Sequence, residues 1–196
     1  MFKEIVIRLI RYSGILAIVV FVSSVIISAS FNPWFSILDN AFSELGGSKA
    51  SMPYIFNYGL IIFGFFMLLF SIYAIYISNN KIETVSGSFM VIASFYFMMI
   101  GIFPYDFNPM WVHVFVSLSS FLIGYLSVIV CGVGLIVGGR KIMGLILLLI
   151  SLFSPFAVDF FSLYSAALVE SYGIFVLTVW ILLLTFFYTK KAINTQ

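Results

Sequence analysis

Six apolar runs, each about as long as a transmembrane helix, divide the chain of 196 residues. A helix needs about 20 apolar residues to cross roughly 30 Å of hydrocarbon. The runs cover about residues 9–31, 54–78, 85–103, 109–137, 142–163 and 166–188, and a longer polar loop occupies residues 32–52. Because lipid offers the backbone no hydrogen-bond partner, runs of this kind must be helical. We therefore predict an all-α fold, a polytopic transmembrane bundle of six helices that forms one integral membrane domain over residues 1–196.

Prolines mark the ends of several of these runs. Pro33 follows the first run, Pro53 stands in the first turn of the second, and Pro104 closes the third. Ser154-Pro155 interrupts the fifth run, so we expect a break in the helix there.

Composition excludes most other classes of protein. The chain is 63% apolar and 8% charged, whereas a soluble domain is about 45–50% apolar and about 25% charged. The only cysteine, Cys131, rules out an intrachain disulfide framework and metal sites built on several thiolates. The only histidine, His113, rules out haem held by two histidines. We therefore expect no metal and no cofactor, neither haem nor an iron–sulfur cluster, and no nucleic-acid partner, because that needs a basic face.

The basic residues predict how the chain is oriented in the membrane. With six spans both termini lie on one side, and eight of the nine basic residues fall there: Lys3, Arg8, Arg11, Lys81, Arg140, Lys141, Lys190 and Lys191. Only Lys49 falls on the opposite side. Because Lys and Arg are enriched in cytoplasmic loops, we expect a multi-pass protein of the cell membrane with both termini in the cytoplasm.

The acidic residues show the opposite distribution. Only Glu4 and Glu83 fall on the side of the termini. The outer side or the helix ends just beneath it hold the other carboxylates and the single histidine: Asp39, Glu44, Asp106, Asp159, Glu170 and His113. This concentration of ionisable groups is the most informative polar feature of the sequence.

Three of these residues are candidates for a functional site. His113 and Glu170 each lie about one turn inside a span, where ionisable groups face the bundle interior. Glu44 lies in the loop beside glycines and could act as a general base or contact a headgroup. We name these three as candidate catalytic residues, but no nucleophile–base motif is visible, so whether the protein is an enzyme stays open.

A wider set could line a ligand-binding cavity that opens outward. Its members are Glu44, Asn57, Asp106, His113, Asp159 and Glu170. His113 is the expected partner of Glu170, since both lie at a similar depth. The alternative is an internal polar clamp, in which the same residues hold the helix ends together.

Small residues four apart recur in the fourth span, at Ser120/Gly124, Ser127/Cys131 and Gly134/Gly138. Such pairs let helices approach closely. We expect packing against neighbouring spans of the same chain, with a homo-oligomer as the alternative.

Two motifs carry a resemblance to a known family. Ser43-Glu44-Leu45-Gly46 follows the first span, and Phe56-Asn57-Tyr58-Gly59-Leu60 opens the second. Gly101-Ile102-Phe103-Pro104 and the downstream His113 match a later pattern. Over its whole length the chain resembles the prokaryotic membrane proteins of domain-of-unknown-function family 998. The resemblance implies a six-helix bundle and no agreed activity.

The chain is also similar, more loosely, to the Frag1/DRAM-like membrane proteins. That group places a polar motif in the first outer loop and a phenylalanine-rich second helix, and some of its eukaryotic members act in remodelling glycolipid anchors. The proline-glutamate pair typical of its loop is absent here.

Two functions remain open at this point. In the first, an outward-facing polar pocket binds, and in one version modifies, a lipid or other amphiphile of the outer leaflet, so that membrane lipids are the partners. In the second, the chain is a non-catalytic subunit or scaffold of a larger membrane protein complex, with other membrane subunits or further copies of itself as partners.

Overall fold

The computed structural model describes residues 2–188 of the chain. All regular elements within this range are helical, and six helical segments are long and apolar enough to cross a membrane. The prediction of an all-α chain with six such helices is therefore confirmed.

The helices follow one another with short connections, apart from the long loop after α2. Their bounds are α1 Phe2–Arg11, α2 Ser13–Ser30, α3 Pro53–Ile77, α4 Lys81–Ile102, α5 Trp111–Val137, α6 Lys141–Leu152, α7 Ser154–Ser162 and α8 Ala166–Leu182. A short 3₁₀ helix, η1, covers Phe42–Gly46, and a π-helical turn, η2, covers Leu183–Phe187.

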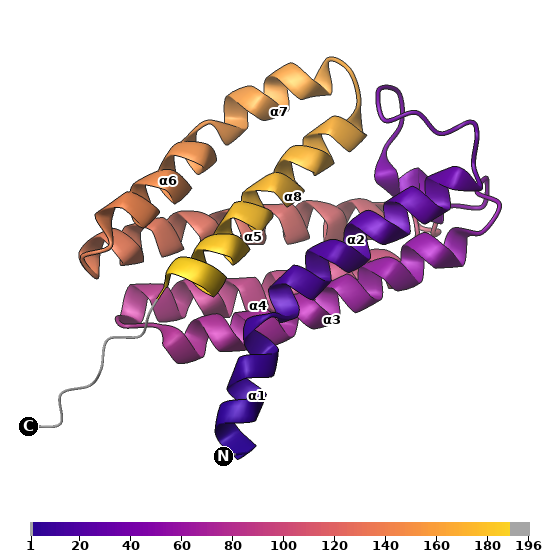
Figure 1. The fold of residues 1–196 in the computed structure, drawn as a ribbon. Coiled ribbons are helices and arrows are strands. Elements are labelled where there is room, and N and C mark those ends of the chain that lie inside the picture. Colours follow the sequence, from indigo (N-terminus) through magenta and orange to yellow (C-terminus); the bar gives the residue numbers. More distant parts are fainter. Residues whose placement is uncertain (1, 189–196) are drawn as a thin grey trace, which may run out of the picture.

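The first predicted span, residues 9–31, is divided in the structure. The helix breaks at Tyr12, so that α2 crosses the bundle while α1 leaves it at an angle (Figure 1). Ser13-Gly14 follows the break directly, and such a pair favours a bend in a helix. Apolar residues continue on both sides of it, which is why the run looked continuous.

The second break lies where Ser154-Pro155 predicted it, between α6 and α7. Pro155 has no N–H to offer the carbonyl of Ser151, four residues earlier, and the Tyr125 hydroxyl donates to that carbonyl instead, at 2.9 Å. The Tyr172 hydroxyl donates to the neighbouring Ile150 carbonyl at 2.7 Å. Side chains of α5 and α8 thus satisfy the backbone that the break exposes, as a membrane interior requires.

The bundle has two ends with different character. At the loop end lie the loop 32–52 and the turns at 103–110 and 163–165; at the terminal end lie Tyr12, the turns at 78–80 and 138–140, and Tyr188 (Figure 1). Among the basic residues whose side chains are described, Lys49 lies at the loop end. The others lie at the terminal end, namely Arg11, Lys81, Arg140 and Lys141. Lys190 and Lys191 lie outside the described residues, and the side chains of Lys3 and Arg8 are not described. The side of the membrane that each end faces stays a prediction.

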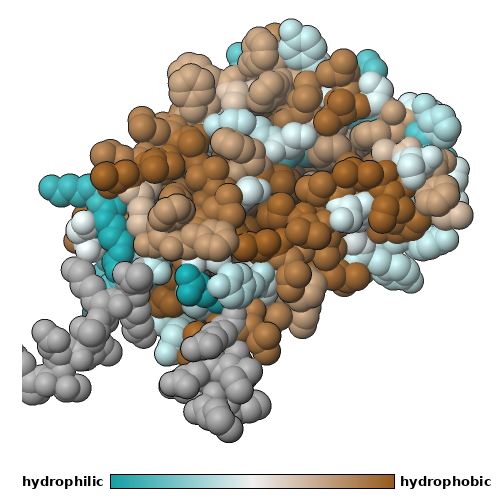
Figure 2. Space-filling model, viewed as in Figure 1, coloured by the Kyte–Doolittle hydropathy of each residue, from teal (hydrophilic) through white to brown (hydrophobic). Residues whose placement is uncertain are grey.

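Aromatic residues fill the core. Phe63 and Phe97 meet edge to face with ring centroids 5.0 Å apart, and Phe70 and Trp180 do so at 5.2 Å. Apolar side chains also cover most of the outer face of the helices, as expected of a surface in contact with lipid (Figure 2).

Close helix contacts depend on glycine. A Cβ at Gly64 of α3 would lie 2.5 Å from Cγ of Met98 on α4. A Cβ at Gly134 of α5 would lie 2.8 Å from Cγ of Glu83, also on α4. The pair Gly134/Gly138 therefore packs within this chain, in agreement with the expected role of such pairs.

Candidate functional site

The loop 32–52 is fastened to the helix ends by hydrogen bonds to its backbone. The Asn40 carbonyl accepts from the Ala167 N–H at 2.9 Å, and the Ile37 carbonyl accepts from the Ser165 hydroxyl at 2.6 Å. The Asn57 side chain of α3 donates to the Gly46 carbonyl at 2.9 Å. The loop is thereby fixed to the starts of α3 and α8.

Glu44 acts inside the loop. Its carboxylate accepts from the Ala41 N–H at 2.8 Å and from the Asn40 side chain at 3.1 Å. These bonds cap the first turn of η1, which is the structural alternative to a catalytic or ligand-binding role.

Asp106 is exposed in the turn between α4 and α5 and binds the far side of the loop. It accepts from the Ser48 N–H at 2.7 Å. The pKa of the Asp106 carboxyl lies below its ordinary value because the Ser48 hydroxyl and then the Ser48 N–H favour the charged form. Asp106 therefore holds the loop in place.

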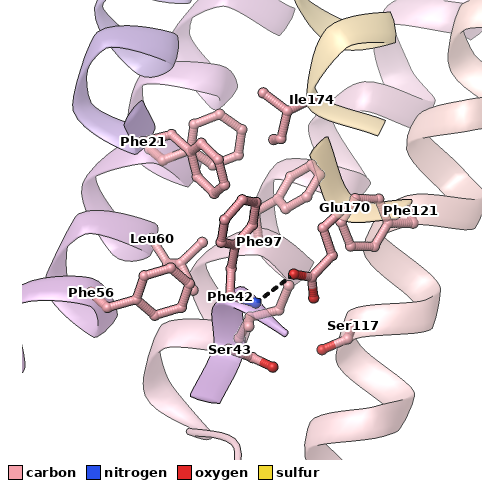
Figure 3. A pocket seen from close by; sticks show the side chains of 12 residues that line it. Phe21, Phe42, Ser43, Phe56, Leu60, Phe97, Ser117, Phe121, Glu170 and Ile174 are labelled. Carbon is pink, nitrogen blue, oxygen red and sulfur yellow. Dashed lines mark hydrogen bonds between the residues drawn. The ribbon is translucent and has the colours of Figure 1, made fainter. Parts of the chain in front are cut away.

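Glu170 of α8 joins the loop to the bundle interior. Its Oε2 atom accepts from the Phe42 N–H at 2.8 Å, so the start of η1 is fixed against α8. Figure 3 shows the second carboxylate oxygen turned away from this bond, toward the hydroxyls of Ser43 and Ser117.

His113 is buried near the start of α5, with 4% of its surface exposed. Its Nδ1 atom lies 2.7 Å from the Phe103 carbonyl oxygen. Because a carbonyl only accepts, Nδ1 carries the proton, and in the neutral ring Nε2 is then an acceptor. The Ser117 hydroxyl lies 3.4 Å from Nε2 and donates to it.

Beneath η1 lies a cavity of about 30 Å³. Most of its wall is aliphatic or aromatic, formed by Phe21, Phe42, Phe56, Leu60, Phe63, Phe97, Ile100, Phe121 and Ile174. The remaining lining residues form a polar corner, which we define as Ser43, Ser117 and Glu170 (Figure 3). A water molecule needs about 10–15 Å³ by this measure, so the cavity has room for one or two water-sized groups.

The structure brings only some of the candidate residues together. In the part of the chain that the structure describes, no hydrogen bond or ion pair joins Glu170 to His113. Ser117 is hydrogen-bonded to His113 and lines the cavity together with Glu170. Asp159 is exposed on α7 and is not among the residues that line the cavity. Glu44, Asn57 and Asp106 bind loop backbone instead.

The polar corner contains two residues that the sequence analysis did not single out, Ser43 and Ser117. Ser43 lies in the motif that carries the family resemblance, which is a signal that could have found it. Ser117 lies one helical turn after His113, a spacing that places both side chains on one face of a helix.

A second polar cluster, at the terminal end, was also missed. Glu83 of α4 has 6% of its surface exposed and accepts from the Asn79 N–H at 2.8 Å, from the Asn80 side chain at 3.0 Å and from the Tyr188 hydroxyl. The Arg140 guanidinium lies 4.0 Å from the centre of the Tyr188 ring. The cluster joins the α3–α4 turn, the α5–α6 turn and Tyr188 at the end of η2, so we assign it a structural role.

Neither cluster resembles a metal centre. Within residues 2–188, no three His, Cys, Asp or Glu side chains lie together in a way that could hold a metal ion. The loop-end cavity instead combines apolar walls with a few convergent polar groups, the usual composition of a small-molecule pocket.

Fold and site together define a multi-pass, six-helix membrane protein with a small polar-cornered cavity beneath its long loop. The chain belongs to the family DUF998, described as a protein of unknown function, whose sequence profile matches residues 15–186. No curated protein and no solved structure matches the chain. The looser similarity to the Frag1/DRAM-like proteins stays a prediction.

Proposed function

We propose that this protein binds a lipid or other amphiphile at the loop end, with the polar part of the ligand in the cavity beneath η1. On this proposal the loop end faces outward, both termini are cytoplasmic, and the ligand comes from the outer leaflet of the cell membrane. The observation that carries the proposal is the polar corner at one end of a cavity whose other walls are apolar. An amphiphile has the same division between a polar head and an apolar chain.

The loop forms the wall of the cavity that an entering ligand would have to displace. As described, the cavity holds only one or two water-sized groups, so an acyl chain can enter only if the loop or nearby side chains shift. Phe42 closes the cavity from the loop side and is held there by Glu170 through a backbone hydrogen bond. Ligand binding would therefore compete with, or rearrange, this bond.

The proposal is tested with three radiolabelled amphiphiles of equal chain length: dodecylamine, dodecanol and dodecyltrimethylammonium. Binding is measured to the full chain in lipid nanodiscs, with empty nanodiscs as the blank. Saturable binding of at least one probe is expected. It should be lost in Ser117→Leu, which fills the cavity, and kept in the matched variant Ser88→Leu, whose serine is exposed on α4. Absence of saturable binding of all three probes, or equal binding by both variants, would overturn the proposal.

A non-catalytic subunit or scaffold is the second candidate. It is favoured by Glu44, Asn57 and Asp106, which all bind loop backbone and give the loop a fixed surface. His113→Ala separates the two candidates. In a scaffold the polar residues act only as an internal clamp that holds the helix ends together, so the His113→Ala variant should lose much of its stability. In a ligand site the variant should lose probe binding while its stability is little changed.

A further inference from the structure

The polar corner of the loop-end cavity has an arrangement of hydrogen-bond acceptors that selects one class of headgroup. We propose that the cavity binds a primary ammonium group, R–NH₃⁺, and discriminates against quaternary ammonium and neutral hydroxyl heads. The inference rests on the proposed function, since it concerns the same cavity. It adds the chemistry of the ligand.

The hydrogen bonds around Ser117 have a direction that His113 determines. The Phe103 carbonyl accepts the Nδ1 proton of His113, and in the neutral ring Nε2 is then an acceptor. The Ser117 hydroxyl is therefore the donor in its hydrogen bond with Nε2. What Ser117 offers to the cavity is then a pair of oxygen lone pairs and no donor.

One carboxylate oxygen of Glu170 accepts from the Phe42 N–H, at 2.8 Å. The other oxygen is turned toward Ser117 and Ser43 (Figure 3). An ionised carboxylate is an acceptor only, and the oxygen of each serine hydroxyl has lone pairs. With Glu170 ionised, the corner therefore presents a negative charge and oxygen lone pairs from three side chains.

A primary ammonium carries three N–H donors on one compact positive charge, which matches an acceptor set of three side-chain oxygen atoms from Glu170, Ser43 and Ser117. Hydrogen bonds between charged partners are roughly twice as strong as neutral ones. The phenylalanine rings of the wall, Phe42 and Phe121 among them, add a surface that favours a cation.

The number of N–H donors discriminates against the nearest competitors. A trimethylammonium head has no N–H, so it can make none of the hydrogen bonds that the oxygen atoms of the corner accept. A hydroxyl head has one donor and no charge, so it leaves most of the acceptors unpaired. His113 acts in this scheme as a positioning residue, because it orients Ser117 and does not touch the ligand.

The experiment compares probes that differ only in their heads. Dodecylamine at pH 7 is expected to bind the full chain in nanodiscs at least tenfold more tightly than dodecyltrimethylammonium or dodecanol. Ethanolamine, which has the same ammonium without a chain, separates a free amine from an amphiphile as the source. Competition of dodecylamine by millimolar ethanolamine would assign the site to the ammonium alone, and no competition would assign it to an amphiphile that carries one.

Two substitutions test the residues. Glu170→Gln keeps an oxygen for the Phe42 N–H and removes the charge, so dodecylamine should bind about tenfold to hundredfold more weakly. Ser117→Ala should weaken it about fivefold to tenfold. Asp159→Asn, which removes an exposed carboxylate elsewhere on the loop-end side, should leave affinity unchanged.

The outcomes separate this inference from the proposed function. Saturable binding of dodecanol or dodecyltrimethylammonium as tight as that of dodecylamine, lost in Ser117→Leu, would keep the amphiphile site and overturn the ammonium assignment. Dodecylamine binding that Glu170→Gln leaves unchanged would overturn it as well. Absence of binding by every probe would overturn both.

Discussion

Replacing Glu83 tests how much the terminal-end cluster contributes to folding. The carboxylate accepts three hydrogen bonds, from the Asn79 N–H, the Asn80 side chain and the Tyr188 hydroxyl, in a position that is almost fully buried. Glu83→Ala leaves all three donors without this acceptor. At about 1 kcal/mol for each lost bond, and with a further penalty for donors that stay buried, the free energy of unfolding should fall by about 3–5 kcal/mol.

A double-mutant cycle isolates the bond to Tyr188. Tyr188→Phe alone should cost about 2–3 kcal/mol, because it removes the bond to the charged Glu83 and the bond that the Tyr188 hydroxyl accepts from the Asn79 side chain. In the double variant, which combines Glu83→Ala with Tyr188→Phe, the bond between Glu83 and Tyr188 cannot be lost twice. The combined cost should therefore be smaller than the sum of the single costs, by about 1–3 kcal/mol.

The assay is reversible unfolding in mixed micelles of dodecyl maltoside and SDS, followed by tryptophan fluorescence, which reports on the buried Trp180 close to the cluster. Asp159→Ala is the matched control, and an exposed carboxylate of this kind should change stability by less than about 0.5 kcal/mol. Strictly additive costs in the cycle, or a Glu83→Ala variant as stable as the control, would refute the reasoning.

Three further predictions concern the loop and the helix contacts. Asp106→Asn should lower the thermal midpoint at pH 7. Because the pKa of Asp106 lies below its ordinary 3.8, the stabilisation is present above that pH and is lost as the pH falls through the lowered pKa. The two proteins should therefore converge once the pH is below the lowered pKa, and a difference that stays constant with pH would contradict the reasoning. Gly64→Ala should cost about 1–3 kcal/mol of unfolding free energy through the clash with Met98, and a change below about 0.5 kcal/mol would place α3 and α4 further apart than described. For orientation, a cysteine at Ser48 should react with an impermeant maleimide on intact cells and one at Lys81 should not, while the buried native cysteine stays silent; the reverse pattern would invert the topology.

The fold was largely predictable because its strongest determinant is local. Each span is an apolar run of sufficient length, and the backbone of such a run can only be satisfied as a helix in lipid. The break at Pro155 was predictable for the same kind of reason, since proline lacks an N–H. The break at Tyr12 was missed because its signal, the pair Ser13-Gly14, permits a bend in a helix but does not require one.

The candidate site was only partly predictable. The depth of His113 and Glu170 in their spans correctly indicated that both face the interior of the loop end, but depth does not determine which side chains meet. Ser117 is the residue that connects the two, because it is hydrogen-bonded to His113 and lines the cavity with Glu170. Serine is too frequent in these spans for the sequence to single it out. Glu83 was missed because it lies next to Lys81 and two asparagines, a pattern typical of an exposed turn.

The most direct test of the amphiphile-binding site is a cryo-electron microscopy map of the full chain in nanodiscs with and without dodecylamine. Density for the amine should fill the space between Glu170, Ser43 and Ser117 and continue as an apolar chain, and it should be absent without the amine. A cavity that contains nothing larger than water at saturating dodecylamine would contradict the proposed site.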